Sequence, residues 1–322
     1  MAAAVVSAVG TAWALGHARR HGLFDVPGER RSHRLETPRG GGIGIVIACL
    51  GCLVVMAITE GGNPRWWLVA AGLGMVAGIG WMDDHRPLPA WPRFGVHVVG
   101  AFMLALALHF GGAGTLVCAA GFVLALGLVN AWNFMDGING LAASQALLCG
   151  MAFAVSPGFP APMLGIALAG ACVGFLPFNF PRAHVFLGDV GSTSLGYMVA
   201  ALLAIGISSA AATREWPLLL LAPLVMLTDS VLTLLWRMHR GDRWWKAHAE
   251  HAFQRWSRNK GHIIVTLAYG LWTLIVIAVM LCVRHTPGDT GLIAFLACVS
   301  TTSLGWWWLH RKYASQSAGF GS

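Results

Sequence analysis

Two adjacent carboxylates, Asp83 and Asp84, directly follow an apolar segment, and their residue types and spacing could support catalysis. Neighbouring carboxylates repel each other unless a cation or a proton offsets the repulsion. Mg²⁺ prefers oxygen ligands, and proteins usually hold it with one or two carboxylates while substrate phosphates complete its coordination. The pair therefore indicates a magnesium site. A solvated loop pair neutralised by Arg86 is the alternative.

A second polar stretch, residues 130–140, lies between two long apolar segments. Asn133 and Asp136 are three residues apart, so they share one helical face if the preceding helix continues that far. Their side chains and that of Asn139 can hydrogen-bond ribose hydroxyls, amides or the edge of a uracil. An ordinary turn of a membrane protein also uses Asn, Asp and Gly. The stretch thus indicates a nucleotide site only if the other polar clusters lie beside it.

The sequence Gly188-Asp189-Val190-Gly191-Ser192 opens a further apolar segment. A carboxylate, a hydroxyl and free backbone N–H groups would then meet at a helix N-terminus, where the helix dipole favours anions. This arrangement is typical of a diphosphate and metal site. Phe186, which precedes it by two residues, could stack on a base.

Two basic clusters offer cations to the same kind of ligand. Arg39 precedes three glycines and a predicted helix, so a guanidinium and backbone N–H groups could bind a phosphate together. His248 and His251 lie at i and i+3, on one helical face, among Lys and Arg residues. Phosphate fits this pair better than zinc, because no third ligand pattern accompanies it. For the loop around Arg39, charge that sets topology or binds anionic lipid is the alternative.

The segments that must position these clusters are long and apolar. The chain of 322 residues is 57% hydrophobic and 11% charged, whereas soluble domains carry roughly a quarter charged residues. We therefore expect an all-α, polytopic integral membrane bundle that forms one unit over residues 1–322. About eleven segments are predicted to span the membrane: 2–17, 41–58, 66–82, 94–110, 115–132, 141–156, 161–178, 190–210, 216–236, 262–283 and 290–309.

The distribution of positive charge predicts the orientation of the bundle. Of the 21 Lys and Arg residues, all but Arg65, Arg214 and Arg284 fall in loops on one side. The positive-inside rule makes that side cytoplasmic, and an odd number of spans then places the N-terminus outside and the C-terminus in the cytoplasm. The polar clusters share the cytoplasmic side, in loops at about 18–40, 83–93, 130–140, 179–192 and 237–261.

One carboxylate, Asp229, lies inside a predicted span. An ionisable residue within a membrane segment marks a functional site by default. Asp229 could be the relay of a membrane transporter, or it could make a structural polar contact inside the bundle. The transporter alternative predicts polar residues near the midplane of several helices, whereas here the polar residues concentrate at one surface.

The order of these motifs resembles that of a known family. The motifs are His33 with Pro38-Arg39-Gly40-Gly41, Asp83-Asp84, Asn133-Phe134-Met135-Asp136-Gly137-Ile138-Asn139-Gly140, Asn179 with Phe186-Leu187-Gly188-Asp189-Val190-Gly191-Ser192, and His248-Ala249-Glu250-His251. This pattern is similar to that of the polyprenyl-phosphate N-acetylhexosamine-1-phosphate transferases, glycosyltransferase family 4, from about residue 20 to 260. The histidine motif and the short outer loops resemble the branch that initiates O-antigen or other surface polysaccharides. The muramoyl-pentapeptide phosphotransferases of peptidoglycan synthesis are the alternative branch.

The resemblance implies that a UDP-N-acetylhexosamine donates its sugar 1-phosphate to undecaprenyl phosphate and releases UMP. It implies Mg²⁺ as cofactor, with Mn²⁺ as the other candidate, in a bacterial cytoplasmic (inner) membrane. The expected partners are the two substrates and the lipid bilayer, without nucleic acid, and a homodimer is compatible with the pattern. The hexosamine stays open among N-acetylglucosamine, N-acetylfucosamine and N-acetylquinovosamine.

The resemblance also implies a role for each motif residue. Asp189 is expected to be the main Mg²⁺ ligand and Asp84 its helper, while Asp83 would position or deprotonate the acceptor phosphate. The residues expected to hold the nucleotide-sugar are Asn133, Asp136, Asn139, Asn179 and Phe186. The residues expected to hold phosphates are Arg39, His248 and His251, and His33 is expected to bind substrate with them.

Overall fold

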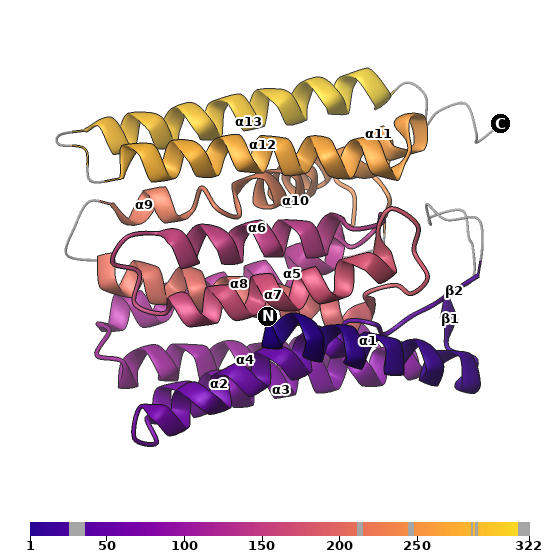
Figure 1. Ribbon diagram of the computed structural model, residues 1–322. Coiled ribbons are helices and arrows are strands. Elements are labelled where there is room, and N and C mark those ends of the chain that lie inside the picture. The colour runs from indigo at the N-terminus through magenta and orange to yellow at the C-terminus, as the bar shows by residue number, and fades with distance from the viewer. Residues whose placement is uncertain (26–35, 211–214, 244–247, 285, 287–288, 315–322) are drawn as a thin grey trace.

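The computed structural model describes residues 1–25, 36–210, 215–243, 248–284, 286 and 289–314. Within these residues the chain is almost entirely helical, with one short antiparallel ribbon, and most helices lie side by side (Figure 1). The helices are α1 (Ala2–His21), α2 (Ile43–Thr59), α3 (Pro64–His85), α4 (Ala90–Phe110), α5 (Thr115–Met135), α6 (Leu141–Val155), α7 (Pro162–Asn179), α8 (Gly188–Ala210), α9 (Trp216–Leu219), α10 (Leu224–His239), α11 (Ala252–Lys260), α12 (His262–Val283) and α13 (Thr290–Ala314). The strands are β1 (Phe24–Asp25) and β2 (Thr37–Pro38).

The predicted all-α bundle is confirmed, and seven of its helices are long and apolar enough to cross a membrane. These are α3, α4, α5, α7, α8, α12 and α13. Helices α2 and α6 are also apolar but shorter. The total of eleven spans and the outward N-terminus stay predictions.

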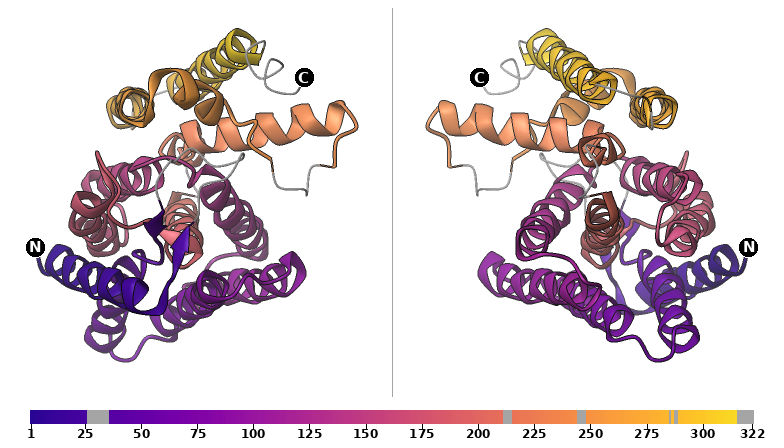
Figure 2. Two further views of the ribbon diagram at one scale, coloured as in Figure 1. Left: turned by 90° about the vertical axis from the view of Figure 1, so that its right-hand side faces the viewer. Right: turned by 90° about the vertical axis from the view of Figure 1, so that its left-hand side faces the viewer.

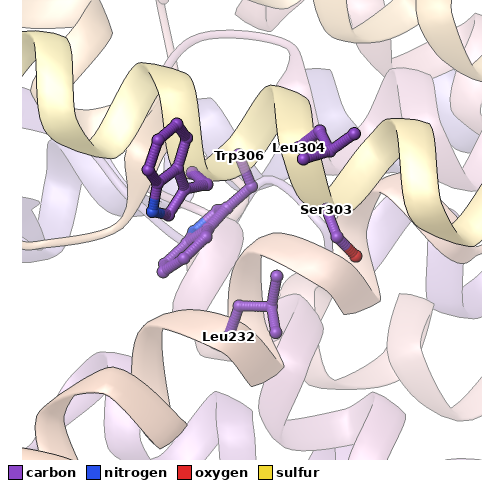
Figure 3. Close-up of a pocket in the computed structure, with 5 residues that line it drawn as sticks. Leu232, Ser303, Leu304 and Trp306 are labelled. Carbon is purple, nitrogen blue, oxygen red and sulfur yellow. The ribbon is translucent and has the colours of Figure 1, made fainter.

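The segment 216–236, predicted as one continuous span, is instead broken into α9 and α10. Residues 220–223 separate the two helices, and prolines stand at positions 217 and 223. Proline has no N–H to donate and is tolerated best at the start of a helix, and Pro223 is the residue that precedes α10. After this break α10 runs across the direction of the other helices and projects from the bundle (Figure 2). A hollow of about 340 Å³ lies where α10 meets α13, lined by Leu232, Ser303, Leu304, Trp306 and Trp307 (Figure 3).

Helix α8 lies at the centre of a ring formed by the earlier helices (Figure 2), and every residue of its apolar stretch is buried. Glycines allow the neighbouring helices to approach it closely. A Cβ added to Gly80 of α3 would lie 2.6 Å from the carbonyl oxygen of Asp189, and one added to Gly196 would lie 2.3 Å from that of Leu128. The N-terminus of α8 is therefore fixed tightly against α3.

The ribbon and the loop before α8 form a short layer of backbone hydrogen bonds at the end of the bundle where β1 and β2 lie (Figure 1). The N–H of Phe186 donates to the carbonyl oxygen of Pro38 at 2.7 Å. The N–H groups of Gly41 and Gly42 donate back to Phe186 and Leu187, each at 2.9 Å. These bonds place the loop that follows β2 next to the N-terminus of α8.

Candidate active site

Two of the predicted catalytic carboxylates converge on one cation. Asp83 is in the last turn of α3, Asp189 is in the first turn of α8, and Arg93 is in the first turn of α4. The Nη1 atom of Arg93 lies 2.6 Å from an Oδ2 atom of each carboxylate. Two carboxylates that share one positive charge in this way are arranged as they would be around a bound metal ion.

Asp84 is 2% exposed and caps the N-terminus of α8. Its Oδ1 accepts the N–H of Asp189 at 3.0 Å and its Oδ2 accepts the N–H of Val190 at 3.1 Å. The first N–H groups of a helix have no partner inside the helix, so a carboxylate stabilises them strongly. Asp84 thus fixes the position of Asp189, and its expected role as a helper ligand of the metal stays a prediction.

Gly188 makes this contact feasible. Its φ of +76° lies in the left-handed region, and an added Cβ would lie 2.5 Å from Oδ2 of Asp84 and 2.8 Å from the N atom of Gly40. Only glycine fits both the backbone angle and the space. This position is where the first loop, α3 and α8 come together.

Asn133, near the end of α5, ties the 130–140 stretch to the carboxylates. Its Nδ2 lies 3.2 Å from Oδ1 of Asp189 and 3.1 Å from Oγ of Ser192. Asp136 follows α5 directly. Burial and then the nearby charges of Asp189 and Asp84 raise the pKa of Asp136 to about 8. The 130–140 stretch and the start of α8 therefore form one acidic site.

Arg39 lies at the same site. Its Nη2 donates to the backbone carbonyl oxygen of Asp83 at 3.3 Å, and its Nε is buried without a hydrogen-bond partner. An unpartnered guanidinium N–H close to the carboxylates is suited to an incoming phosphate oxygen. His33, which belongs to the same loop, lies outside the described residues.

Asn179 contacts the backbone of two loops, and its predicted contact with the nucleotide-sugar stays a prediction. Its Oδ1 accepts the N–H of Gly140 at 2.7 Å, and its Nδ2 donates to the carbonyl oxygen of Val185 at 2.9 Å. The residue is 6% exposed. Its two hydrogen bonds join the loop at Gly140 to the loop at Val185. Phe186, in the second of these loops, is half-buried.

Asn139 also contacts the protein itself. Its Nδ2 donates to the carbonyl oxygen of Pro181 at 3.1 Å, and its own carbonyl oxygen accepts the hydroxyl of Thr266 at 2.8 Å. It thereby links the 130–140 stretch to α12. The predicted contact of Asn139 with the nucleotide stays a prediction.

The histidine motif lies beside the same stretch. The rings of His248 and His251 are 4.9 Å apart, and the ring of Phe134 in α5 is 6.2 Å from that of His251. Burial, His251 and Arg237 lower the pKa of His248 to about 4. His248 is therefore neutral at pH 7 and can offer a phosphate a hydrogen bond but no charge. Each of the two rings has a buried Nδ1 without a hydrogen-bond partner.

Three arginines that sequence reasoning did not assign to the site hold the histidine motif. The carboxylate of Glu250 accepts hydrogen bonds from Arg237, from Arg240 at 2.6 Å and from Arg255 at 3.1 Å. These arginines lower the pKa of Glu250, although burial acts in the opposite direction. From the sequence, their positive charge predicted the orientation and a phosphate site near the histidines, without a role for each arginine.

Arg93 is the other functional residue that the sequence analysis missed. The available signal was a lone arginine at the start of the apolar segment that follows Asp83 and Asp84, on the same predicted side of the membrane. Only the packing of α4 against α8 shows that it lies between two carboxylates.

The donor set fits a hard divalent cation in its chemistry. Within the described residues, no group of three or more His, Cys, Asp or Glu side chains has metal-holding geometry. Asp83 and Asp189 nevertheless direct one oxygen each at the same nitrogen of Arg93. The guanidinium thus occupies the place between the two carboxylates where a metal cation would be held. Two carboxylates with substrate phosphates as further ligands is the usual way in which proteins hold Mg²⁺.

The carboxylate of Asp229 on α10 is fully hydrogen-bonded inside the protein. It accepts backbone N–H groups of Ala252 and Phe253 and the hydroxyls of Thr233 and Tyr269. These contacts support the structural alternative for Asp229 over the transporter relay.

Comparisons with known proteins agree with this site. The model of the family described as glycosyl transferase family 4 matches residues 66–207, which include both carboxylates that contact Arg93. The decaprenyl-phosphate N-acetylglucosaminephosphotransferase of Mycolicibacterium smegmatis is 36% identical over 236 residues, 62% of this chain and 57% of that protein. The matched stretch thus spans little more than half the length of that relative.

Two other relatives are matched over more of their length. The decaprenyl-phosphate N-acetylglucosaminephosphotransferase of Mycobacterium leprae is 30% identical over 323 residues, 85% of this chain and 80% of that protein. The phospho-N-acetylmuramoyl-pentapeptide-transferase of Heliobacterium modesticaldum is 30% identical over 238 residues, 62% of this chain and 72% of that protein. With these matches and the arrangement of its polar clusters, the chain belongs to glycosyl transferase family 4.

Proposed function

We propose that this protein transfers an N-acetylhexosamine 1-phosphate from a UDP-sugar to a polyprenyl phosphate. An oxygen of the acceptor phosphate forms a bond to the phosphorus that carries the sugar. The bond from that phosphorus to the oxygen of UMP breaks, and UMP leaves. The products are UMP and a lipid-diphosphate-linked sugar.

One observation carries the proposal: Asp83 and Asp189 lie 2.6 Å from the same nitrogen of Arg93, at one end of the bundle. The donor diphosphate and the acceptor phosphate bring about four negative charges to that place, and these must be neutralised before one phosphate can approach another. Carboxylates alone would repel the substrates. Mg²⁺, with Mn²⁺ as the other candidate, would be held by Asp189 with Asp83 nearby and would supply the positive charge that phosphoryl transfer requires.

The acceptor phosphate is assigned to the Asp83 side of the site. A phosphate monoester is already largely ionised near neutral pH, so a strong base is not needed. Asp83 would orient the acceptor, together with the guanidinium of Arg39, which lies against the carbonyl group of Asp83. Asp84 acts through the backbone of α8, whose first N–H groups it holds.

The nucleotide-sugar is assigned to the surface between residues 130–140 and the histidine motif. Asn133 and Asp136 supply polar atoms next to Asp189, and Phe186 supplies a half-buried ring. Asn179 shapes this surface by fixing Gly140 and Val185. His248 and His251 would hydrogen-bond the diphosphate of the donor.

The comparisons favour N-acetylglucosamine as the sugar. The relatives with the higher identity, 36%, bear the name decaprenyl-phosphate N-acetylglucosaminephosphotransferase, whereas the muramoyl-pentapeptide enzymes are 28–30% identical. We place the protein in a bacterial cytoplasmic membrane with its site towards the cytoplasm. There it would act on undecaprenyl phosphate and start O-antigen or another envelope polysaccharide. The muramoyl-pentapeptide reaction is the second candidate, favoured by a match that covers 85% of one such relative.

The test is UMP release by the purified full chain in detergent with undecaprenyl phosphate. Separate reactions would contain UDP-N-acetylglucosamine, UDP-N-acetylfucosamine, UDP-N-acetylquinovosamine or UDP-N-acetylmuramoyl-pentapeptide, each with Mg²⁺ or with EDTA. We expect lipid-dependent and metal-dependent UMP release with a UDP-N-acetylhexosamine. Release only with the muramoyl-pentapeptide donor would establish the second candidate, and absence of release from every donor in folded protein would refute the transferase.

A further inference from the structure

We propose that Asp229, the buried carboxylate of α10, is a positioning residue that holds the histidine segment 248–251 in the geometry needed for catalysis. The inference rests on the proposed function, because the histidines need a fixed position only if they bind substrate. Asp229 and His251 are each 2% exposed. The carboxylate contacts His251 and the start of α11, so its effect on a substrate would pass through these residues.

Asp229 contacts the start of α11 directly. Its Oδ1 accepts the N–H of Ala252 at 2.9 Å, and its Oδ2 accepts the N–H of Phe253 at 3.1 Å. These are the first two N–H groups of the helix, which have no partner within it. A capping side chain usually stands immediately before its own helix. α11 has such a local contact, because the N–H of His251 donates to Oε1 of Gln254 at 3.3 Å. Asp229 adds a cap from a different helix, so it fixes where α11 begins relative to α10.

Asp229 is itself held in place by one residue of its own helix and by one residue of α12. The hydroxyl of Tyr269 on α12 donates to it at 2.8 Å, and that of Thr233 on α10 donates at 3.1 Å. The indole N–H of Trp306 on α13 donates to the Thr233 hydroxyl at 3.2 Å, beside the hollow between α10 and α13 (Figure 3). With four donors the buried charge is satisfied, which makes the carboxylate an anchor with a fixed position.

Two residues at the start of α11 connect Asp229 to the candidate site. The Nδ1 of His251, the residue before α11, lies 3.7 Å from Oδ1 of Asp229. Phe253, two residues after His251, packs against the 130–140 stretch. A Cβ added to Gly137 would lie 3.0 Å from the ring of Phe253. A shift of the start of α11 would therefore move both histidines relative to Asn133 and Asp136.

A second tether reaches the same segment from further along α10. Arg237, two turns after Asp229, donates to the carboxylate of Glu250. This tether is partly exposed, since the side chain of Glu250 is 25% exposed, and exposed ion pairs hold less firmly than buried ones. We therefore assign the larger share of the positioning to Asp229.

The experiment is a double-mutant cycle with the full chain in detergent and UMP release as the readout. The variants are Asp229→Asn, His248→Ala and both together. In Asp229→Asn an NH₂ group replaces one oxygen and faces a backbone N–H, so the cap is broken without loss of volume. We expect kcat/KM to fall about tenfold or more, mainly through a higher KM for the UDP-sugar. In the double mutant, Asp229→Asn should lower kcat/KM little beyond the loss caused by His248→Ala alone, since both substitutions act on the histidine segment.

A matched control separates positioning from general destabilisation. Thr273, also on α12, makes a buried hydrogen bond to Gln145 of α6 at 2.7 Å and has no hydrogen bond to Asp229. Thr273→Val should lower thermal stability and leave KM close to that of the parent protein. Losses that multiply independently in the Asp229/His248 cycle would overturn the proposal.

Amide hydrogen exchange gives a readout that does not depend on activity. In Asp229→Asn we expect faster exchange at residues 248–255, with no change there in Thr273→Val. If the parent releases no UMP from any donor, the proposed function fails, and this measurement still decides whether Asp229 holds the segment. Unchanged exchange at 248–255 in Asp229→Asn would overturn the positioning role.

Discussion

The α3–α8 region and the α10–α13 region hold their polar residues in different ways. In the first region α8 is buried along its whole apolar stretch and the carboxylates are fixed by direct contacts of 2.6–3.2 Å. In the second region only 11% of the apolar stretch of α13 is buried, and the histidine motif lies between helices. The family model matches residues 66–207, which lie in the first region.

This difference separates two tasks. On the proposed function, the charges that meet the transferring phosphorus are placed on the most buried helices, where little reorganisation is needed. The histidines are placed on a segment whose position depends on its contacts with Asp229 and Arg237. We expect substitutions in the first region to lower kcat, and substitutions that loosen the second region to raise KM.

The largest effect is expected for Asp189→Asn. Loss of this carboxylate removes the proposed main ligand of the metal and the partner of Arg93, so UMP release should fall by about a thousandfold or more. The control is Asp242→Asn, an exposed carboxylate paired with Arg240 in the second region. It should stay within about twofold of the parent. Equal activity of the two variants would contradict the metal assignment.

Two glycines with nearly the same positive φ, one in each region, give the next largest expected difference. Gly188 and Gly241 have φ of +76° and +77°, but a Cβ would be crowded only at Gly188, since Gly241 has nothing within 4 Å. Gly241→Ala should cost about 1 kcal/mol of stability, the cost of the left-handed angle alone. Gly188→Ala should cost more and also lower UMP release, because it displaces Asp84 and Gly40. Thermal unfolding and activity of both variants check this, and similar losses would refute it.

Arg93→Gln tests whether the arginine stands in for a cation. Without the guanidinium, Asp83 and Asp189 repel each other, so the metal-free protein should melt at a lower temperature. Added Mg²⁺ should then raise the melting temperature by more than it does in the parent, since it offsets that repulsion. Arg86→Gln changes an exposed arginine that directly follows α3, and this variant should respond to Mg²⁺ like the parent. An equal response of the parent and Arg93→Gln would contradict this role.

The smallest effect is expected from the protonation of Asp136. Its pKa is raised to about 8 in the metal-free protein, so the folded state binds a proton that the unfolded state has released. The resulting stabilisation is present at low pH and is lost as pH rises from about 4 to 8. Asp136→Asn should flatten this part of the stability curve in EDTA, measured as melting temperature against pH. Curves of the same slope for both proteins would contradict the raised pKa.

Much of the site could be predicted because its residues stand out against an apolar background. Asp83, Asp136 and Asp189 are rare charges next to long apolar segments, and one side of the predicted bundle collects them. The same reasoning could not distinguish a substrate contact from a contact inside the protein. Asn179 and Asp84 have the residue types of ligands, yet their polar atoms bind backbone groups of neighbouring loops.

By itself, the sequence determined that the chain is an all-α membrane bundle with its polar motifs at helix ends, because hydrophobicity and charge are local properties of each segment. Only the tertiary structure decided which ends meet. It brought Arg93 between two carboxylates, broke the predicted span 216–236 into α9 and α10, and gave Asp229 the start of α11 as its partner. These outcomes depend on which helices pack against one another, and that is decided by contacts between residues far apart in the chain.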